Sequence, residues 1–194
     1  GGSITVDAAD DALHSNANAT ISGGSFTLAT GDDGLHADNN TAISGGTITI
    51  SQSYEGIEGK TIAISGGNIT LTASDDGLNA AGGNDQSGFG GGMRPDTFSS
   101  GDSDCSITIS GGKIIINADG DGIDSNGNLY VTGGETYVSG PTNGGNGALD
   151  YDGEATITGG IVVAAGSTGM AQNFSDSSTQ GAMLVNVSSN SATG

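Results

Sequence analysis

Residues 32–50 read DDGLHADNNTAISGGTITI, and this segment carries the repeating unit of the chain. Residues 10–28 read DDALHSNANATISGGSFTL, which is the same unit 22 positions earlier. Both segments hold an acidic pair, a Gly-Gly pair and apolar residues that alternate with polar ones. A fixed period of this length is typical of a solenoid, in which each repeat forms one coil that stacks on the next.

Glycine pairs mark the same point of successive repeats. They stand at Gly1-Gly2, Gly23-Gly24, Gly45-Gly46, Gly66-Gly67, Gly111-Gly112, Gly133-Gly134 and Gly159-Gly160. Most steps are 21 or 22 residues, but the step from Gly66 to Gly111 is 45. This step predicts either one coil with a loop insertion at about residues 80–104 or two irregular coils. Each pair is expected to form a corner, where positive φ and the missing Cβ let the chain turn between two sheets.

Apolar residues alternate within each repeat, as at Ile48 and Ile50, which is the periodicity of a strand. Strands this short need to coil and stack in parallel, which places equivalent residues about 4.8 Å apart. The predicted inward columns are Leu13, Leu35, Ile57, Leu78, Ile123 and Leu149; Ile21, Ile43, Ile64, Ile109, Val131 and Ile157; Phe26, Ile48, Ile69, Ile114, Thr136 and Val162; and Leu28, Ile50, Leu71, Ile116, Val138 and Ala164. We therefore predict an all-β, single-domain right-handed parallel β-helix over residues 1–194, with coils of about 22 residues.

The composition is strongly acidic, with 22 Asp and Glu, 3 Lys and Arg, and a net charge of -19. So few cations exclude DNA or RNA as a partner, because phosphates need Lys and Arg. No run of about 18 apolar residues predicts a membrane span. The single cysteine, Cys105, and the abundance of small polar residues favour a secreted or cell-surface protein. Residues 1–6 begin inside a repeat, so we expect an export signal and earlier coils to precede them.

An acidic corner recurs just before the first apolar column. Its residues are Asp10, Asp11, Asp32, Asp33, Glu55, Asp75, Asp76 and Asp121, and Glu58, Asp124 and Asp150 directly follow the column residue. Asp-Gly pairs are good turn formers, which is the simpler explanation of any one corner. Stacked carboxylates about 5 Å apart would, however, repel by roughly 3 kcal/mol at an effective dielectric constant of about 20. Calcium accepts six to eight oxygens and can bridge neighbouring coils, so we expect these residues to bind Ca²⁺.

Other chemistry has weaker support. His14 and His36 fall in one column and are expected to be exposed imidazoles, with a transition-metal site or a sugar contact as alternatives. No Ser-His-Asp pattern or phosphate loop is present, and no catalytic residue is predicted. Elimination from a uronate would need a base and a cation near calcium, for which Lys60, Arg94 and Lys113 are the candidates.

Three motifs together resemble a family of clostridial carbohydrate-binding β-helix proteins, which are similar to calcium-dependent pectate lyases. The motifs are Asp32-Asp33-Gly34-Leu35-His36, Ala42-Ile43-Ser44-Gly45-Gly46 and Asp75-Asp76-Gly77-Leu78-Asn79. The resemblance covers residues 1–165. It implies a secreted protein that binds plant cell-wall polysaccharides such as cellulose and pectin, with calcium held by the acidic coils. The candidate sugar-contacting residues are Tyr54, His36, Lys60 and Arg94, and further candidate stacking residues are Tyr130, Tyr137 and Tyr151.

Three functions remain open at this point: a non-catalytic polysaccharide-binding protein, a calcium-dependent lyase, and a structural or adhesive surface solenoid. Fold alone does not choose among them. In the lyases that the chain resembles, a lysine near calcium acts as the base. Neither Lys60 nor Lys113 lies in a motif that would carry this role over, so the sequence favours binding without catalysis.

Overall fold

The computed structural model describes residues 1–81 and 104–187, and in these ranges the chain forms strands and turns without a helix. The strands of the main sheet are β1 (Ser3–Ala8), β3 (Asn18–Thr30), β5 (Asn40–Gln52), β7 (Thr61–Ala73), β9 (Ser106–Ala118), β11 (Asn128–Ser139), β13 (Ala155–Ile157) and β14 (Ile161–Ala165). Short strands follow the corners: β2 (His14–Ser15), β4 (His36–Ala37), β6 (Ile57–Glu58), β8 (Leu78–Ala80), β10 (Ile123–Ser125) and β12 (Asp150–Tyr151). The predicted all-β class is confirmed.

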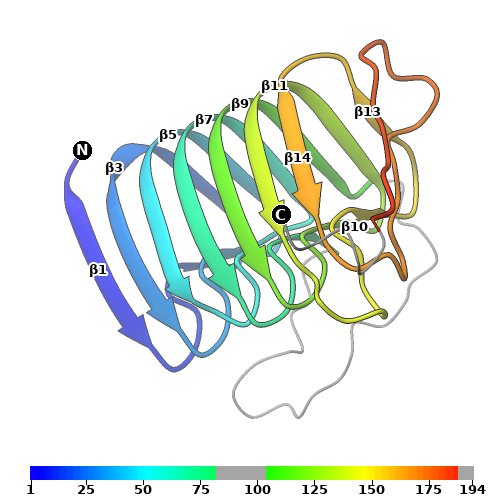
Figure 1. Cartoon of the computed structure of the whole chain (residues 1–194). Coiled ribbons are helices and arrows are strands. Elements are labelled where there is room, and N and C mark those ends of the chain that lie inside the picture. Colours follow the sequence, from blue (N-terminus) through cyan, green and yellow to red (C-terminus); the bar gives the residue numbers. More distant parts are fainter. Residues whose placement is uncertain (82–103, 188–194) are drawn as a thin grey trace.

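The strands pair in parallel, each with the strand one repeat away. The main sheet has the order β1-β3-β5-β7-β9-β11-β13, and β14 also pairs with β11. The short strands form two further sheets, β2-β4 and β6-β8-β10-β12, which an isolated bridge between Leu35 and Ile57 connects. Figure 1 shows the coils stacked along one axis from β1 to β14. The chain is therefore a parallel β-solenoid, as its period predicted.

The core is a set of aliphatic ladders inside the solenoid. All four predicted columns occur: Ile43, for example, pairs with Ile64, and Ile50 pairs with Leu71. Both pairs are about 1% exposed, whereas residues in the first coil, such as Leu13 and Phe26, are half-buried. A fifth inward column, missed in the sequence, consists of Ala19, Thr41, Ile62, Ile107, Leu129 and Ala155. Its members lie two residues before the second predicted column, so extending the alternation backwards would have found it.

The glycine pairs bend a strand and do not join two sheets, so this part of the prediction is wrong. Five of the seven pairs lie inside one continuous strand of the main sheet, as Gly45 and Gly46 do in β5, and Gly159-Gly160 lies between β13 and β14 of the same sheet. The second glycine has positive φ, +101° at Gly46, as predicted. The pairing register shifts there, between Ile43 and Thr47, which is the behaviour of a bulge that turns a strand sharply.

The 45-residue step between Gly66 and Gly111 is one coil with an insertion. Strand β7 pairs directly with β9, and β8 pairs directly with β10, so no further coil separates them. Residues 82–103 of the predicted insertion, including Arg94, lie outside the described residues. Residues 1–81 and 104–187 contain no helix that is long and apolar enough to cross a membrane.

Candidate functional site

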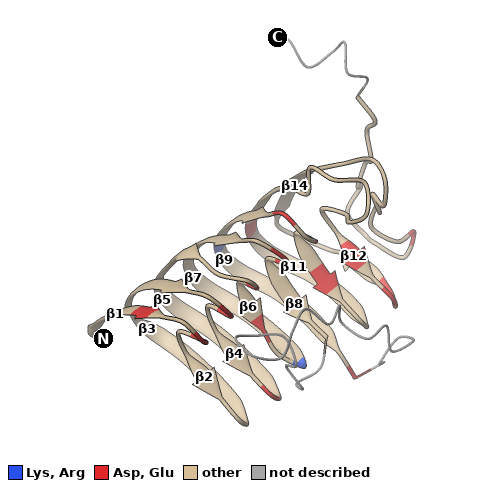
Figure 2. Cartoon of the chain, turned by 90° about the horizontal axis from the view of Figure 1, so that it is seen from below, with Lys and Arg blue, Asp and Glu red and all other residues tan. Residues whose placement is uncertain are grey.

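The acidic corners form one edge of the solenoid, where each coil leaves the main sheet and enters a short strand. Figure 2 shows Asp and Glu recurring from coil to coil beside β2, β4, β6, β8 and β12. Parallel stacking produces this arrangement, because the repeats carry their acidic residues at equivalent places directly before or after Leu or Ile of the first column.

Four corner carboxylates each use one oxygen to hold the next coil. Asp11 Oδ1 accepts a hydrogen bond from the backbone N–H of Asp33 at 3.1 Å, and Asp33 Oδ1 accepts one from Glu55 N–H at 3.3 Å. Asp76 Oδ1 and Asp121 Oδ1 accept in the same way from the N–H groups of Asp121 and Gly147, both at 2.5 Å. These bonds join neighbouring coils and not the local backbone groups that Asp-Gly turn chemistry would use, and the second oxygen of Asp11 and of Asp33 faces a histidine.

Asp76, Asp121 and Asp124 form a cluster whose carboxylate oxygens lie within 4.8 Å of one another. Burial raises the pKa of Asp76 well above its usual range, and the charges of Asp124, Asp75 and Asp121 raise it further. Burial also raises the pKa of Asp121 to about 6, although the hydrogen bond from Gly147 opposes this. All donors here are oxygens, the ligand type that a hard cation such as Ca²⁺ prefers.

A second group of oxygens comes from Asp10, Asp11 and Asp32, again within 4.8 Å of one another. Asp10 is exposed and Asp32 is 2% exposed, so this group reaches from the surface into the corner. Like the first cluster it fits a hard cation by its donor set.

A third group differs, because it contains a histidine. His36 Nδ1 contacts Glu58 Oε2 and lies 3.3 Å from Asp33 Oδ2, while its Nε2 lies 3.2 Å from Asp38 Oδ1. Burial lowers the pKa of His36, but its hydrogen bonds to Asp33 and Glu58 outweigh this effect and raise the pKa to about 11. Burial raises the pKa of Asp33, and the charge of Glu58 adds to it.

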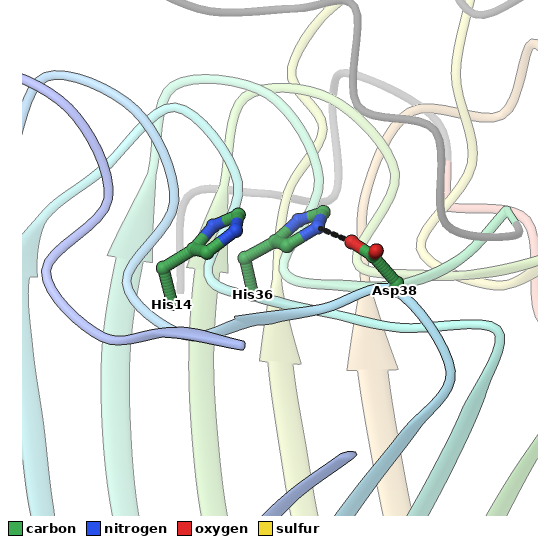
Figure 3. Close-up of side chains that lie close together, drawn as sticks. All are labelled: His14, His36 and Asp38. Carbon is green, nitrogen blue, oxygen red and sulfur yellow. Dashed lines mark hydrogen bonds and ion pairs between the residues drawn. The ribbon is translucent and has the colours of Figure 1, made fainter. Parts of the chain in front are cut away.

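The two histidines share a column, as expected, but not an environment. Their rings stack with centroids 4.8 Å apart and planes within 6° (Figure 3). The His14 side chain is 43% exposed and contacts Asp11 Oδ2 at 2.5 Å, whereas the His36 side chain is only 1% exposed. The prediction that both imidazoles are exposed is therefore wrong for His36, and its buried ring offers no face to a sugar.

The structure groups most, but not all, of the predicted metal ligands. Glu55, Asp75 and Asp150 lie at the corners but outside the groups described above. Asp38 was missed, because no acidic residue repeats at its position in the neighbouring coils. Only spatial proximity to His36 shows its role.

The candidate sugar-contacting residues are scattered. Tyr54 is half-buried at the third acidic corner, and Lys60 Nζ lies 3.5 Å from Asp104 Oδ2. Tyr151 donates its hydroxyl to the Asn173 carbonyl at 2.6 Å. On the outer face of the main sheet, Lys113 Nζ lies 5.8 Å from the centre of the Tyr137 ring.

Comparison with known proteins gives one match. A family model described as "Carbohydrate-binding domain-containing protein" matches residues 1–34, which include β1, β3 and the first two acidic corners. The comparisons with curated proteins and with solved structures gave no match. The first coils of this chain are thus similar to a carbohydrate-binding family, and the solenoid fold is compatible with a polysaccharide as partner.

Proposed function

We propose that the chain is a non-catalytic polysaccharide-binding protein whose all-oxygen acidic clusters hold calcium. The observation that carries the proposal is the match of residues 1–34 to a carbohydrate-binding family, made by coils whose geometry repeats along the whole solenoid. A repeating protein surface suits a repeating polymer, because each coil can offer the same contact to successive sugars. Since cell-wall polysaccharides are extracellular, the proposal requires secretion or display on the cell surface.

The outer face of the main sheet is where we place a neutral glycan such as cellulose. One outward column there contains Thr5, Thr27, Thr49, Thr70, Ile115, Tyr137 and Val163, which pair in register. The threonine hydroxyls can donate and accept hydrogen bonds at intervals of about 4.8 Å. The Tyr137 ring could stack on a sugar at the end of this row.

Calcium is supported by the donor chemistry of the two all-oxygen clusters. Asp76 with Asp121 and Asp124, and Asp10 with Asp11 and Asp32, would hold it. Bound calcium would supply positive charge at a corner of a chain with net charge -19. The carboxylates would neutralise part of that charge, and their hydrogen bonds to the next coil would keep them in place.

The experiment is a pull-down on insoluble cellulose and on calcium-crosslinked and soluble pectate, with and without chelator, while absorbance reports unsaturated uronates. We expect binding without unsaturated product, and a higher melting temperature in calcium than in chelator, because only the folded state binds the ion. Tyr137→Ala should weaken cellulose binding, whereas Tyr130→Ala, outside the threonine row, should not. Absence of binding to any polysaccharide, or release of unsaturated product, would contradict the proposal.

A further inference from the structure

We propose that Asp33, His36 and Glu58 form a site for a divalent transition-metal ion such as Zn²⁺, which would link two consecutive coils. The proposal is independent of calcium and of polysaccharide binding. Two of the ligands belong to one acidic corner and the third to the next coil, where Glu58 N–H donates to the Leu35 carbonyl at 2.8 Å. That backbone bond fixes the position of Glu58 relative to His36.

The distance between Asp33 and His36 suits a small ion, whereas Glu58 Oε2 contacts His36 Nδ1 directly and would move outward to make room for it. Asp33 Oδ2, His36 Nδ1 and Glu58 Oε2 all lie within 4.8 Å of one another, and the first two are 3.3 Å apart. Two ligands that bind zinc tetrahedrally at about 2.0–2.1 Å lie about 3.3 Å apart, so this pair already has the required separation. The three protein ligands would leave a fourth position for water.

His36 is oriented as a metal ligand would be. Its Nε2 faces Asp38 Oδ1 at 3.2 Å and can keep its proton there, so Nδ1, which faces the other two carboxylates, is the nitrogen that would give up its proton to the ion. Histidines that bind a metal through one ring nitrogen commonly donate a hydrogen bond from the N–H of the other nitrogen to a carboxylate. The ring of His14 stacks on the ring of His36 in a parallel plane (Figure 3).

The charges converge in a place that is nearly closed to water. The side chains of Asp33, His36 and Glu58 are 0%, 1% and 8% exposed. One proton on Nδ1 can be donated to one of the two carboxylate oxygens at a time, whereas a divalent ion binds all three atoms together. The imidazole also distinguishes this site from the all-oxygen clusters, since nitrogen suits Zn²⁺ or Co²⁺ better than Ca²⁺.

Cobalt titration of the whole, chelator-treated chain tests the proposal. We expect stoichiometric binding with the intense visible absorption of four- or five-coordinate Co²⁺, displacement by Zn²⁺, and no effect of millimolar Ca²⁺. Nitrogen-15 spectra of the zinc-bound protein should show His36 ligated through Nδ1 and protonated on Nε2. No visible absorption, or an unaltered Nδ1 resonance in excess Zn²⁺, would overturn the proposal without any variant.

Variants then identify the ligands. Folding is checked by circular dichroism. Glu58→Gln should weaken cobalt binding strongly, and Asp38→Asn should weaken it by about 10- to 100-fold, because Asp38 acts through His36. The matched control is His14→Gln, which removes the stacked ring and leaves the three ligands in place. Unchanged affinity in folded Glu58→Gln would overturn the proposal, as would equal loss in His14→Gln, which would assign the ion to His14, His36 and Asp38 instead.

Discussion

Two opposing effects act on the pKa of a corner carboxylate. In Asp121, Oδ1 accepts the backbone N–H of Gly147 in the next coil, which stabilises the charged form. Burial of the carboxylate, together with the charges of Asp150 and Asp75, stabilises the neutral form instead. Burial outweighs the hydrogen bond, so the folded chain holds its proton to higher pH than an unfolded chain would.

This balance predicts how stability depends on pH at the residue level. The pKa of Asp121 rises from 3.8 to about 6 on folding, so between these values the folded state binds more protons than the unfolded state. The free energy of unfolding should therefore fall as pH rises from about 4 to about 6. In chelator, Asp121→Asn should reduce this fall, whereas Asp7→Asn, on the exposed first strand, should not. The measurement is the melting temperature at each pH, and an identical profile in Asp121→Asn and the unaltered chain would contradict it.

Side-chain chemistry at the corners was only partly predictable from the sequence. The period placed Asp11, Asp33 and Asp76 at equivalent corners, since stacking turns a sequence repeat into a spatial column. The burial of each side chain was not predictable, because His14 and His36 have similar local sequences but differ in whether another coil covers them. The hydrogen bonds that the carboxylates accept from the next coil were not predicted, since a turn motif indicates only local partners.

At the scale of elements, the second glycine of five of the pairs allows a sharp bend inside a strand. Gly134 has φ of +82°, and an added Cβ would lie 2.8 Å from the Gly111 carbonyl carbon of the preceding coil. Both the backbone conformation and the stacking distance therefore require glycine. The sequence indicated the glycine requirement correctly, but the continuous hydrogen bonding through the bend depends on register, which composition does not reveal.

We predict that Gly134→Ala destabilises the solenoid by about 1–3 kcal/mol, the cost expected for a side chain held in a disfavoured backbone region. Gly23→Ala is the matched control, because its Cβ would meet nothing within 4 Å and its φ is not positive. Urea denaturation of both variants measures the difference in the free energy of unfolding. Equal stability of the two variants would show that the bend does not require glycine.

A polar residue interrupts one apolar ladder. Thr136 is fully buried between Ile114 and Val162, and its Oγ1 has no hydrogen-bond partner in the part of the chain that the structure describes. Replacing it with valine keeps the shape and removes a buried, unsatisfied hydroxyl.

Thr136→Val should therefore stabilise the protein by about 1–3 kcal/mol, the desolvation cost of such a group. Thr27→Val, on the exposed outer face, should change the free energy of unfolding by less than about 0.5 kcal/mol. Urea denaturation again provides the measurement. A destabilised Thr136→Val variant would indicate that the hydroxyl has a partner, such as a buried water.

The whole molecule combines two kinds of surface on one stack of coils. The main sheet presents a largely uncharged outer column of threonines, whereas the corners carry stacked carboxylates. This division follows from the repeat, since each of the first four coils contributes a threonine to the outer column and acidic residues to the corners. It separates the proposed contact with neutral glycans from any contact that depends on a bound cation.

Pectate binding should depend on calcium, because the chain and polygalacturonate are both anions. At a net charge of -19 the protein should repel the polymer unless bound calcium reverses the local sign and offers open coordination positions to uronate carboxylates. Asp121→Asn combined with Asp124→Asn should therefore reduce pectate binding at least tenfold and leave cellulose binding within about twofold, provided that circular dichroism shows a folded variant.

High salt should weaken pectate binding and spare cellulose binding, since exposed charges are screened. Affinity electrophoresis in soluble pectate measures pectate binding, and pull-down on insoluble cellulose measures cellulose binding. If the folded protein binds pectate equally well in chelator and in calcium, the ion does not bridge the two anions, and the acidic corners act only between coils.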